Sequence, residues 1–190
     1  DEILVDFANK EGVFYFRGSE DDVMDRVIKS ALSRNSNLIV EITGDCPLID
    51  PKIINLAIET YKNNEVDYVS NADIRSYPDG MDVQVYKTEV LQLSQSLTNN
   101  PLDKEHVTRH IRNHPEIFSK IDLIAPNEIY WPELGLTLDY IEDFNLIKEI
   151  IIYFNSKGNQ NFSCLDIINF IKENIELLKI NKDMKRTKNN

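Results

Sequence analysis

The strongest constraint on the fold of this chain is the alternation of helix-like and strand-like segments over its first 71 residues. Apolar residues recur at helical spacing in three segments: 3–8, 23–31 and 53–61. Short apolar runs with the composition of strands lie between or after them, at 13–16, 38–43 and 66–71. Helices that alternate with strands in this way connect parallel neighbours in one sheet. The sequence therefore predicts an α/β fold with a mostly parallel sheet.

Local signals at the ends of these helices agree with this pattern. Gly12 follows the first helix as a stop signal, and Ser19 with Asp22 three residues later is typical of a helix N-terminus. Asp50 can cap the third helix, whose first turn can hold Pro51. The boundaries of the helices are thus predicted by residue chemistry as well as by apolar spacing.

The second half of the chain is less regular. Turn chemistry at 77–80 precedes an alternating strand, 81–86. The remaining predicted elements are helices at 87–97, 103–114, 141–155 and 163–178, and strands at 119–125 and 134–140. Since no linker or internal repeat interrupts them, the sequence predicts a single domain over 1–180. A basic, flexible tail is expected over 181–190.

Charge and composition exclude several kinds of partner. The chain has 190 residues and a formal net charge of -11, which disfavours binding to nucleic acid or to an anionic membrane. No apolar run approaches the roughly 18 residues of a membrane span. Two distant cysteines, Cys46 and Cys164, indicate neither a disulfide framework nor a zinc knuckle. We therefore expect a cytoplasmic protein. Because the chain begins without Met, we also expect it to be a fragment.

An acidic residue follows the second predicted strand. In an open parallel sheet, ligands bind outside the carboxyl ends of the strands, and Asp45 is predicted to lie at such an end. Gly44 before it allows backbone or ligand to come close, and Pro47 stiffens the loop after it. A carboxylate there could hold Mg²⁺, which uses few protein carboxylates. Alternatively, Asp45 forms only an Asx-turn.

A second acid ends another strand. Asp139 closes the predicted strand 134–140, and Glu142 and Asp143 open the next helix. Acids in a first helical turn can simply complement the helix dipole. Asp45 and Asp139, in contrast, could converge on one metal ion, because both follow strands of one sheet. Such a pair is what metal-assisted phosphoryl or nucleotidyl transfer requires.

All three histidines lie on one predicted helix, as His106, His110 and His114. Their i, i+4, i+8 spacing places them in one stripe. The stripe could bind zinc, it could be structural or solvated, or His106 alone could reach a substrate. Arg75 and Tyr77 could contact an acidic ligand.

Several motifs together resemble one family. They are FRGSEDDVMDR (16–26), ITGDCPLIDP (42–51), DYVSN (67–71), YPDGMDVQVY (77–86), EHVTRHI (105–111) and LTLDYIEDF (136–144). In order and spacing, over about residues 1–150, they resemble the family named for spore-coat polysaccharide biosynthesis protein F. That family is similar to the cytidylyltransferases that make CMP-N-acylneuraminate and CMP-KDO.

The resemblance implies a three-layer, Rossmann-like (GT-A-like) nucleotide-diphosphosugar transferase fold. It implies that a sugar hydroxyl attacks the α-phosphate of CTP and that pyrophosphate leaves, with an acidic sugar of the nonulosonic type as acceptor. Asp45 and Asp139 would be the Mg²⁺ ligands, and His106 would assist catalysis. The substrate-binding residues would be Arg17, Asp25, Arg26, Asp79, Gly80 and Asp82. A homodimer is also expected.

One departure from the family concerns the nucleotide. The family begins with a strand and a Gly/Arg-rich loop that grips CTP, whereas the six glycines of this sequence are all isolated. We therefore expect that the first βα unit is missing and that this chain alone is weak or inactive. Two alternatives stay open: a GT-A glycosyltransferase that uses a preformed nucleotide-sugar, and a non-catalytic remnant that binds a partner or a sugar.

Overall fold

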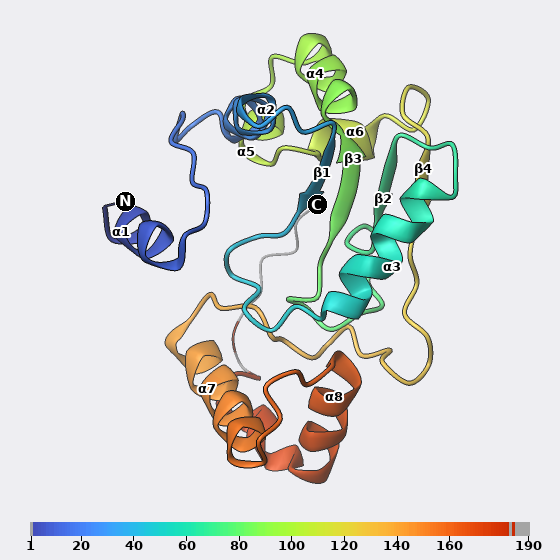
Figure 1. Ribbon diagram of the computed structural model, residues 1–190. Coiled ribbons are helices and arrows are strands. Elements are labelled where there is room, and N and C mark those ends of the chain that lie inside the picture. The colour runs from blue at the N-terminus through green and yellow to red at the C-terminus, as the bar shows by residue number, and fades with distance from the viewer. Residues whose placement is uncertain (1, 183, 185–190) are drawn as a thin grey trace. The chain divides into compact units, whose positions relative to one another are not determined.

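The structure is a computed structural model that describes residues 2–182 and 184 (Figure 1). The chain divides into two compact units. The first unit comprises Asp1–Ile39 and Tyr86–Phe118, and the second comprises Val40–Val85 and Ser119–Asn190. Most of the basic tail predicted over 181–190 lies outside the described residues. Asn181, which the sequence assigned to that tail, is buried.

Four strands are hydrogen-bonded in the order β1-β3-β2-β4. They are β1 (Leu38–Glu41), β2 (Tyr68–Ser70), β3 (Gln84–Lys87) and β4 (Lys120–Asp122). β2 and β4 run parallel, with Val69 opposite Ile121. The predicted α/β class is therefore confirmed. Non-consecutive neighbours in the sheet are typical of crossover connections through helices.

The first unit is mainly helical. It contains α1 (Glu2–Glu11), α2 (Val23–Ser33), α4 (Thr88–Leu97), α5 (Pro101–Glu105) and α6 (Arg109–Asn113). α2 packs on α4 and α5 and buries Met24 and Ile28. Asp22 caps α2, because its side chain accepts a hydrogen bond from the backbone N–H of Asp25 at 2.9 Å. The apolar face that the sequence predicted for this helix is thus buried inside its unit.

In the second unit, α3 (Pro51–Lys62) lies against β2 (Figure 1). The chain continues through α7 (Ile141–Ser156), α8 (Cys164–Glu173) and the 3₁₀ helix η1 (Ile175–Ile180), which packs on α7 and α8. Asp50 caps α3 as predicted, and Ser163 and Asp166 form the predicted capping box of α8. None of the described helices combines the length and apolarity needed to cross a membrane.

Three predicted elements differ from the structure. Residues 13–16 are not a strand: Val13 is 56% exposed and Phe14 53%. A strand needs a hydrogen-bonding neighbour, and within the described residues these four have none in the sheet. Residues 134–140 make only an isolated parallel bridge, Asp79 to Gly135. The helix predicted at 103–114 is broken, because Val107 has a φ of 41°, which an α-helix cannot contain.

Candidate active site

Backbone hydrogen bonds in the second unit bring three distant segments together. The N–H of Leu138 donates to the carbonyl of Asp45 at 2.8 Å. The N–H of Leu136 donates to the carbonyl of Asp79 at 2.7 Å, and the N–H of Asp79 donates to the carbonyl of Leu134 at 2.9 Å. The segment 134–139 therefore contacts both the Asp45 turn and the Asp79 turn. The acids that the sequence singled out at 45, 79 and 139 belong to one backbone framework.

Gly80 is the tightest point of this framework. Its φ is +99°, a conformation that L side chains rarely adopt. A Cβ atom at this position would lie 2.7 Å from the carbonyl carbon of Leu136 and 2.8 Å from the amide nitrogen of Thr137. Backbone cannot move aside as a flexible side chain can. Gly80 is thus required for the close approach of the PDG turn to residues 136–137.

Asp45 lies in a turn after β1 and is partly exposed. The thiol of Cys46 donates to its Oδ1 at 3.5 Å and lies 3.2 Å from Thr43 Oγ1. Burial, and then the neighbouring charges of Asp45 and Asp82, raise the pKa of Cys46 to about 12. Cys46 is therefore a protonated, buried thiol and not a nucleophile. At Gly44 an added Cβ would meet no protein atom within 4 Å, so packing does not require glycine there.

Asp139 is exposed, and its backbone is held from the start of α7. The Oδ2 atom of Asp143 accepts hydrogen bonds from the N–H of Asp139 at 3.2 Å and of Tyr140 at 3.1 Å. The Oδ1 atom accepts from Asn181 Nδ2 at 2.8 Å, and the same amide group donates to the carbonyl of Gly135 at 3.1 Å. Asp143 is fully buried. These two side chains therefore fix the ends of the segment that presents Asp139.

Two acids and a cation occupy the PDG turn. Arg75 Nη1 lies 2.8 Å from Asp79 Oδ1. The charges of both Asp79 and Asp82 act on the Arg75 guanidinium, and the charge of Asp82 acts on Cys46 next to Asp45. Asp82 is thus electrostatically coupled both to Arg75 and to the Asp45 turn. Tyr77, by contrast, is buried in the core with 3% exposure, so it does not present its ring to solvent.

The donor chemistry of this site fits a hard divalent cation. Asp45 and Asp139 offer carboxylate oxygens, which Mg²⁺ prefers, and Mg²⁺ is commonly held by one or two carboxylates while water and phosphate oxygens complete its shell. Among the described residues there is no group of three or more His, Cys, Asp or Glu side chains that could hold a metal. A cage made entirely of protein ligands is therefore not found in that part of the chain, whereas a site completed by substrate phosphates needs only the two acids.

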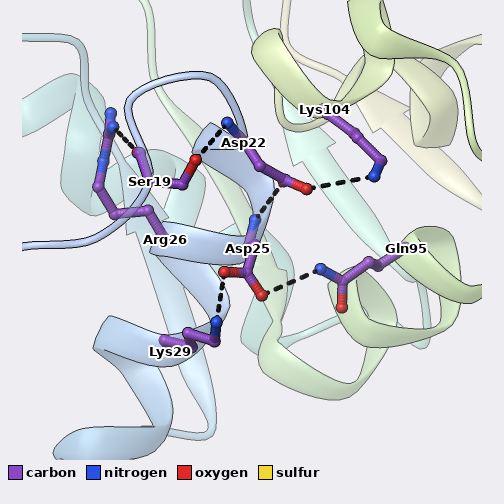
Figure 2. Close-up of polar contacts among 7 residues, drawn as sticks. All are labelled: Ser19, Asp22, Asp25, Arg26, Lys29, Gln95 and Lys104. Atoms are coloured by element: carbon purple, nitrogen blue, oxygen red, sulfur yellow. Dashed lines mark hydrogen bonds and ion pairs between the residues drawn. The ribbon is translucent and has the colours of Figure 1, made fainter.

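The predicted substrate residues Arg17, Asp25 and Arg26 lie in the first unit, where each has a partner. Figure 2 shows the contacts of Asp25 and Arg26 at the start of α2. Asp25 pairs with Lys29 at 2.7 Å and accepts from Gln95 Nε2 at 3.5 Å; the hydrogen bond with Lys29 is the main cause of its lowered pKa. Arg26 donates to the carbonyl of Ser19. Arg17 forms an exposed pair with Glu2 at 2.7 Å. Their contact with substrate stays a prediction.

The three histidines have different surroundings in the first unit. His106 is exposed and forms the C-cap of α5. His110 is buried, lies 3.1 Å from Ser94 Oγ through Nδ1 and packs on the ring of His114 at 4.4 Å. Burial, and then the charge of His114, lower the pKa of His110. His110 is therefore structural. The catalytic role of His106 stays a prediction.

Sequence reasoning missed two residues of this site. Asp143 was recognised as an acid in a first helical turn, but its bond to the backbone of Asp139 was not foreseen. Asp143 has the spacing of a capping box, three residues after the N-cap Tyr140, but tyrosine is not one of the residue types that signal such a box. Asn181 had no sequence signal at all, because its partners are distant in the chain.

Comparison with known proteins identifies relatives over nearly the whole chain. The chain is 31% identical to the spore coat polysaccharide biosynthesis protein SpsF of Bacillus subtilis over 92% of its own length and 71% of that protein. It is also 31% identical to an uncharacterized protein of Methanocaldococcus jannaschii, over 98% of the chain and 74% of the relative. A solved structure of a cytidylyltransferase from Leptospira borgpetersenii matches with a TM-score of 0.86 and 33% identity, over 99% of this chain and 76% of that one.

The fold of that solved enzyme confirms the Rossmann-like nucleotidyltransferase architecture expected from the motifs. A family model described as cytidylyltransferase matches residues 1–186, which is nearly the whole chain. The members of this family are nucleotidyltransferases whose substrates are CTP and a sugar. The chain belongs to the cytidylyltransferase family.

Proposed function

We propose that this protein activates an acidic sugar of the nonulosonic type as its CMP derivative. The observation that carries the proposal is the hydrogen bond from the Leu138 N–H to the Asp45 carbonyl at 2.8 Å. It brings the turn of Asp45 next to the residue before Asp139, in a chain of the cytidylyltransferase family. Two carboxylates at neighbouring backbone positions suit the nucleotidyl transfer of that family.

In this reaction, an oxygen of the sugar hydroxyl forms a bond to the α-phosphorus of CTP. The bond from that phosphorus to the bridging oxygen of the β-phosphate breaks, and pyrophosphate leaves with the electron pair. The hydroxyl proton passes to a base, for which His106 is the candidate residue. Asp45 and Asp139 would hold Mg²⁺, which neutralises charge that develops on phosphate oxygens. Asp79, Gly80 and Asp82 would line the sugar side.

The product is proposed to serve the synthesis of a surface polysaccharide or glycan in the cytoplasm. Support comes from the similarity to SpsF, whose name refers to spore coat polysaccharide. The protein is further proposed to act as a homodimer, in keeping with the resemblance noted for its motifs.

The test is pyrophosphate release from CTP in the presence of Mg²⁺ and a panel of nonulosonic and octulosonic acids, with the full-length gene product. Asp45→Asn and Asp139→Asn should each lower turnover about 100-fold or more, because each removes a carboxylate ligand from the proposed metal site. Asp6→Asn, at an exposed position of α1, changes the charge equally and should have no effect.

Normal turnover and unchanged Mg²⁺ dependence in both site variants would contradict the assignment of the two acids. Sugar transfer from a preformed nucleotide-sugar, without pyrophosphate release from CTP, would identify a glycosyltransferase instead. Binding of a sugar with no turnover of either kind would identify a non-catalytic protein.

A further inference from the structure

Arg75 places a cation directly against the acids of the PDG turn. Its Nη1 atom lies 2.8 Å from Asp79 Oδ1. The side chain of Asp79 is only 14% exposed, whereas that of Arg75 is 44% exposed. One end of the guanidinium is therefore tied to a well-buried acid, and the rest of the group is open to solvent.

The guanidinium of Arg75 has more N–H donors than its contact with Asp79 uses. Arginine carries five N–H donors in a planar fork that matches the two oxygens of a carboxylate. Within the part of the chain that the structure describes, Arg75 has hydrogen-bonding contact with Asp79 alone. Burial lowers the pKa of Arg75, but the hydrogen bond and charge of Asp79, together with the charge of Asp82, raise it overall. The group is a permanent cation.

A cation at this turn would offset the negative charges of Asp79 and Asp82. Asp79 and Asp82 would repel a sugar that carries a carboxylate, since like charges at close range disfavour binding. An arginine held by Asp79 supplies the opposite charge and a two-pronged donor at the same turn. A neutral sugar has no such need. A cation at this turn would therefore favour an acidic sugar over a neutral one.

We propose that Arg75 is the specificity-determining residue that binds the carboxylate of the acidic sugar, with Asp79 holding its guanidinium in place. This inference rests on the proposed function, because it names the residue that selects the acidic substrate class. Arg75 is not assigned to the phosphate chemistry, for which Asp45 and Asp139 are the candidates.

The experiment compares one sugar acid with its own neutral form. The best acid of the panel above and its primary carboxamide are assayed with the full-length wild-type protein and with Arg75→Gln and Arg75→Lys. We expect Arg75→Gln to lower kcat/KM for the acid roughly 10- to 100-fold, mainly through KM, because a charge-assisted hydrogen-bonded pair is lost. The value for the carboxamide should change less than about 3-fold. Arg75→Lys keeps the charge but not the fork, so it should fall between.

A purely structural role for Arg75 would give a different result. If the residue only holds Asp79 and the PDG turn, Arg75→Gln lowers kcat/KM equally for the acid and the carboxamide, and the proposal is overturned. Lys62→Gln removes an equal charge from the same unit, at an exposed position of α3 that pairs with Glu59, and should change neither value. Thermal unfolding of each variant shows whether it is folded.

The two proposals fail in different ways. Pyrophosphate release with an acidic sugar, but no selective loss in Arg75→Gln, overturns the role of Arg75 and leaves the proposed function standing. A wild-type protein that releases pyrophosphate only with neutral sugars, or with no sugar, overturns the acidic-sugar function and the role of Arg75 together.

Discussion

Asp50 joins two helices of the second unit through one buried carboxylate. Its Oδ1 atom accepts from the Lys52 N–H at 2.8 Å, which caps α3. Its Oδ2 atom accepts from the Cys164 N–H at 2.8 Å, which is the first residue of α8. The residue is only 6% exposed, so water does not readily replace it. The free energy of unfolding should therefore be sensitive to Asp50.

The expected size follows from these two bonds. Asp50→Ala removes the cap of α3, which costs about 1 kcal/mol. It also leaves the buried N–H of Cys164 without an acceptor, which costs about 1–3 kcal/mol. The variant should therefore lose about 2–4 kcal/mol of unfolding free energy. Asp50→Asn keeps one acceptor oxygen but turns an NH₂ group toward one of the two N–H donors, so its loss should be smaller.

Urea unfolding followed by far-UV circular dichroism measures the loss directly, with the slope m expected to stay unchanged. Ser163→Ala is the matched control, because it removes a cap from the same α8 without breaking the link to α3. Its loss should be about 1 kcal/mol. If Asp50→Ala loses no more free energy than Ser163→Ala, Asp50 does not connect the two helices as described.

Three further predictions concern single residues. Gly80→Ala should lower the thermal midpoint strongly, because of its φ and its backbone contacts, whereas Gly44→Ala should leave the midpoint unchanged but reduce turnover if substrate approaches there. The buried Tyr77 hydroxyl has no hydrogen-bond partner among the described residues, so urea unfolding of Tyr77→Phe should show equal or higher stability, and a loss above about 1 kcal/mol would indicate a hidden partner. The pKa of His110 is lowered in the folded state, so the unfolded chain binds the proton more readily. Stability should then fall as pH drops through about 6.5, the ordinary histidine pKa, and urea titrations between neutral and acidic pH should show a weaker dependence in His110→Asn.

The predictions from sequence that were confirmed depend on neighbours in the chain. Asp50 with Pro51 and Ser163 with Asp166 mark helix starts through contacts two or three residues away, so the residue types alone carry the information. The break at Val107 was missed for the opposite reason. Its apolar side chain fits the helical pattern and is buried with 4% exposure, and a φ of 41° is rare for a β-branched residue, so nothing in the sequence signals it.

The strand predicted at 13–16 shows how much a strand depends on its neighbours. The residues VFYF have high strand propensity, but propensity in a sheet mainly reflects packing against adjacent strands. In the structure, three of these side chains are exposed: Val13, Phe14 and Tyr15. The apolar pattern alone therefore predicted a strand that does not form, because the sequence could not show that the segment lacks a neighbouring strand.

The sequence shows which residue types form the candidate site, but it does not show the backbone contacts that hold them. The carboxylates at 45 and 139 are visible as residue types at predicted strand ends, which is why the pair could be proposed. The backbone segments that carry them meet through a hydrogen bond from the N–H of Leu138 to the carbonyl of Asp45, and the Leu138 side chain is 39% exposed. Any residue except proline can donate that bond. Since the contact places no requirement on the side chain, no pattern at position 138 could have revealed it. Only the three-dimensional path of the chain brings the Asp45 turn against the residue before Asp139.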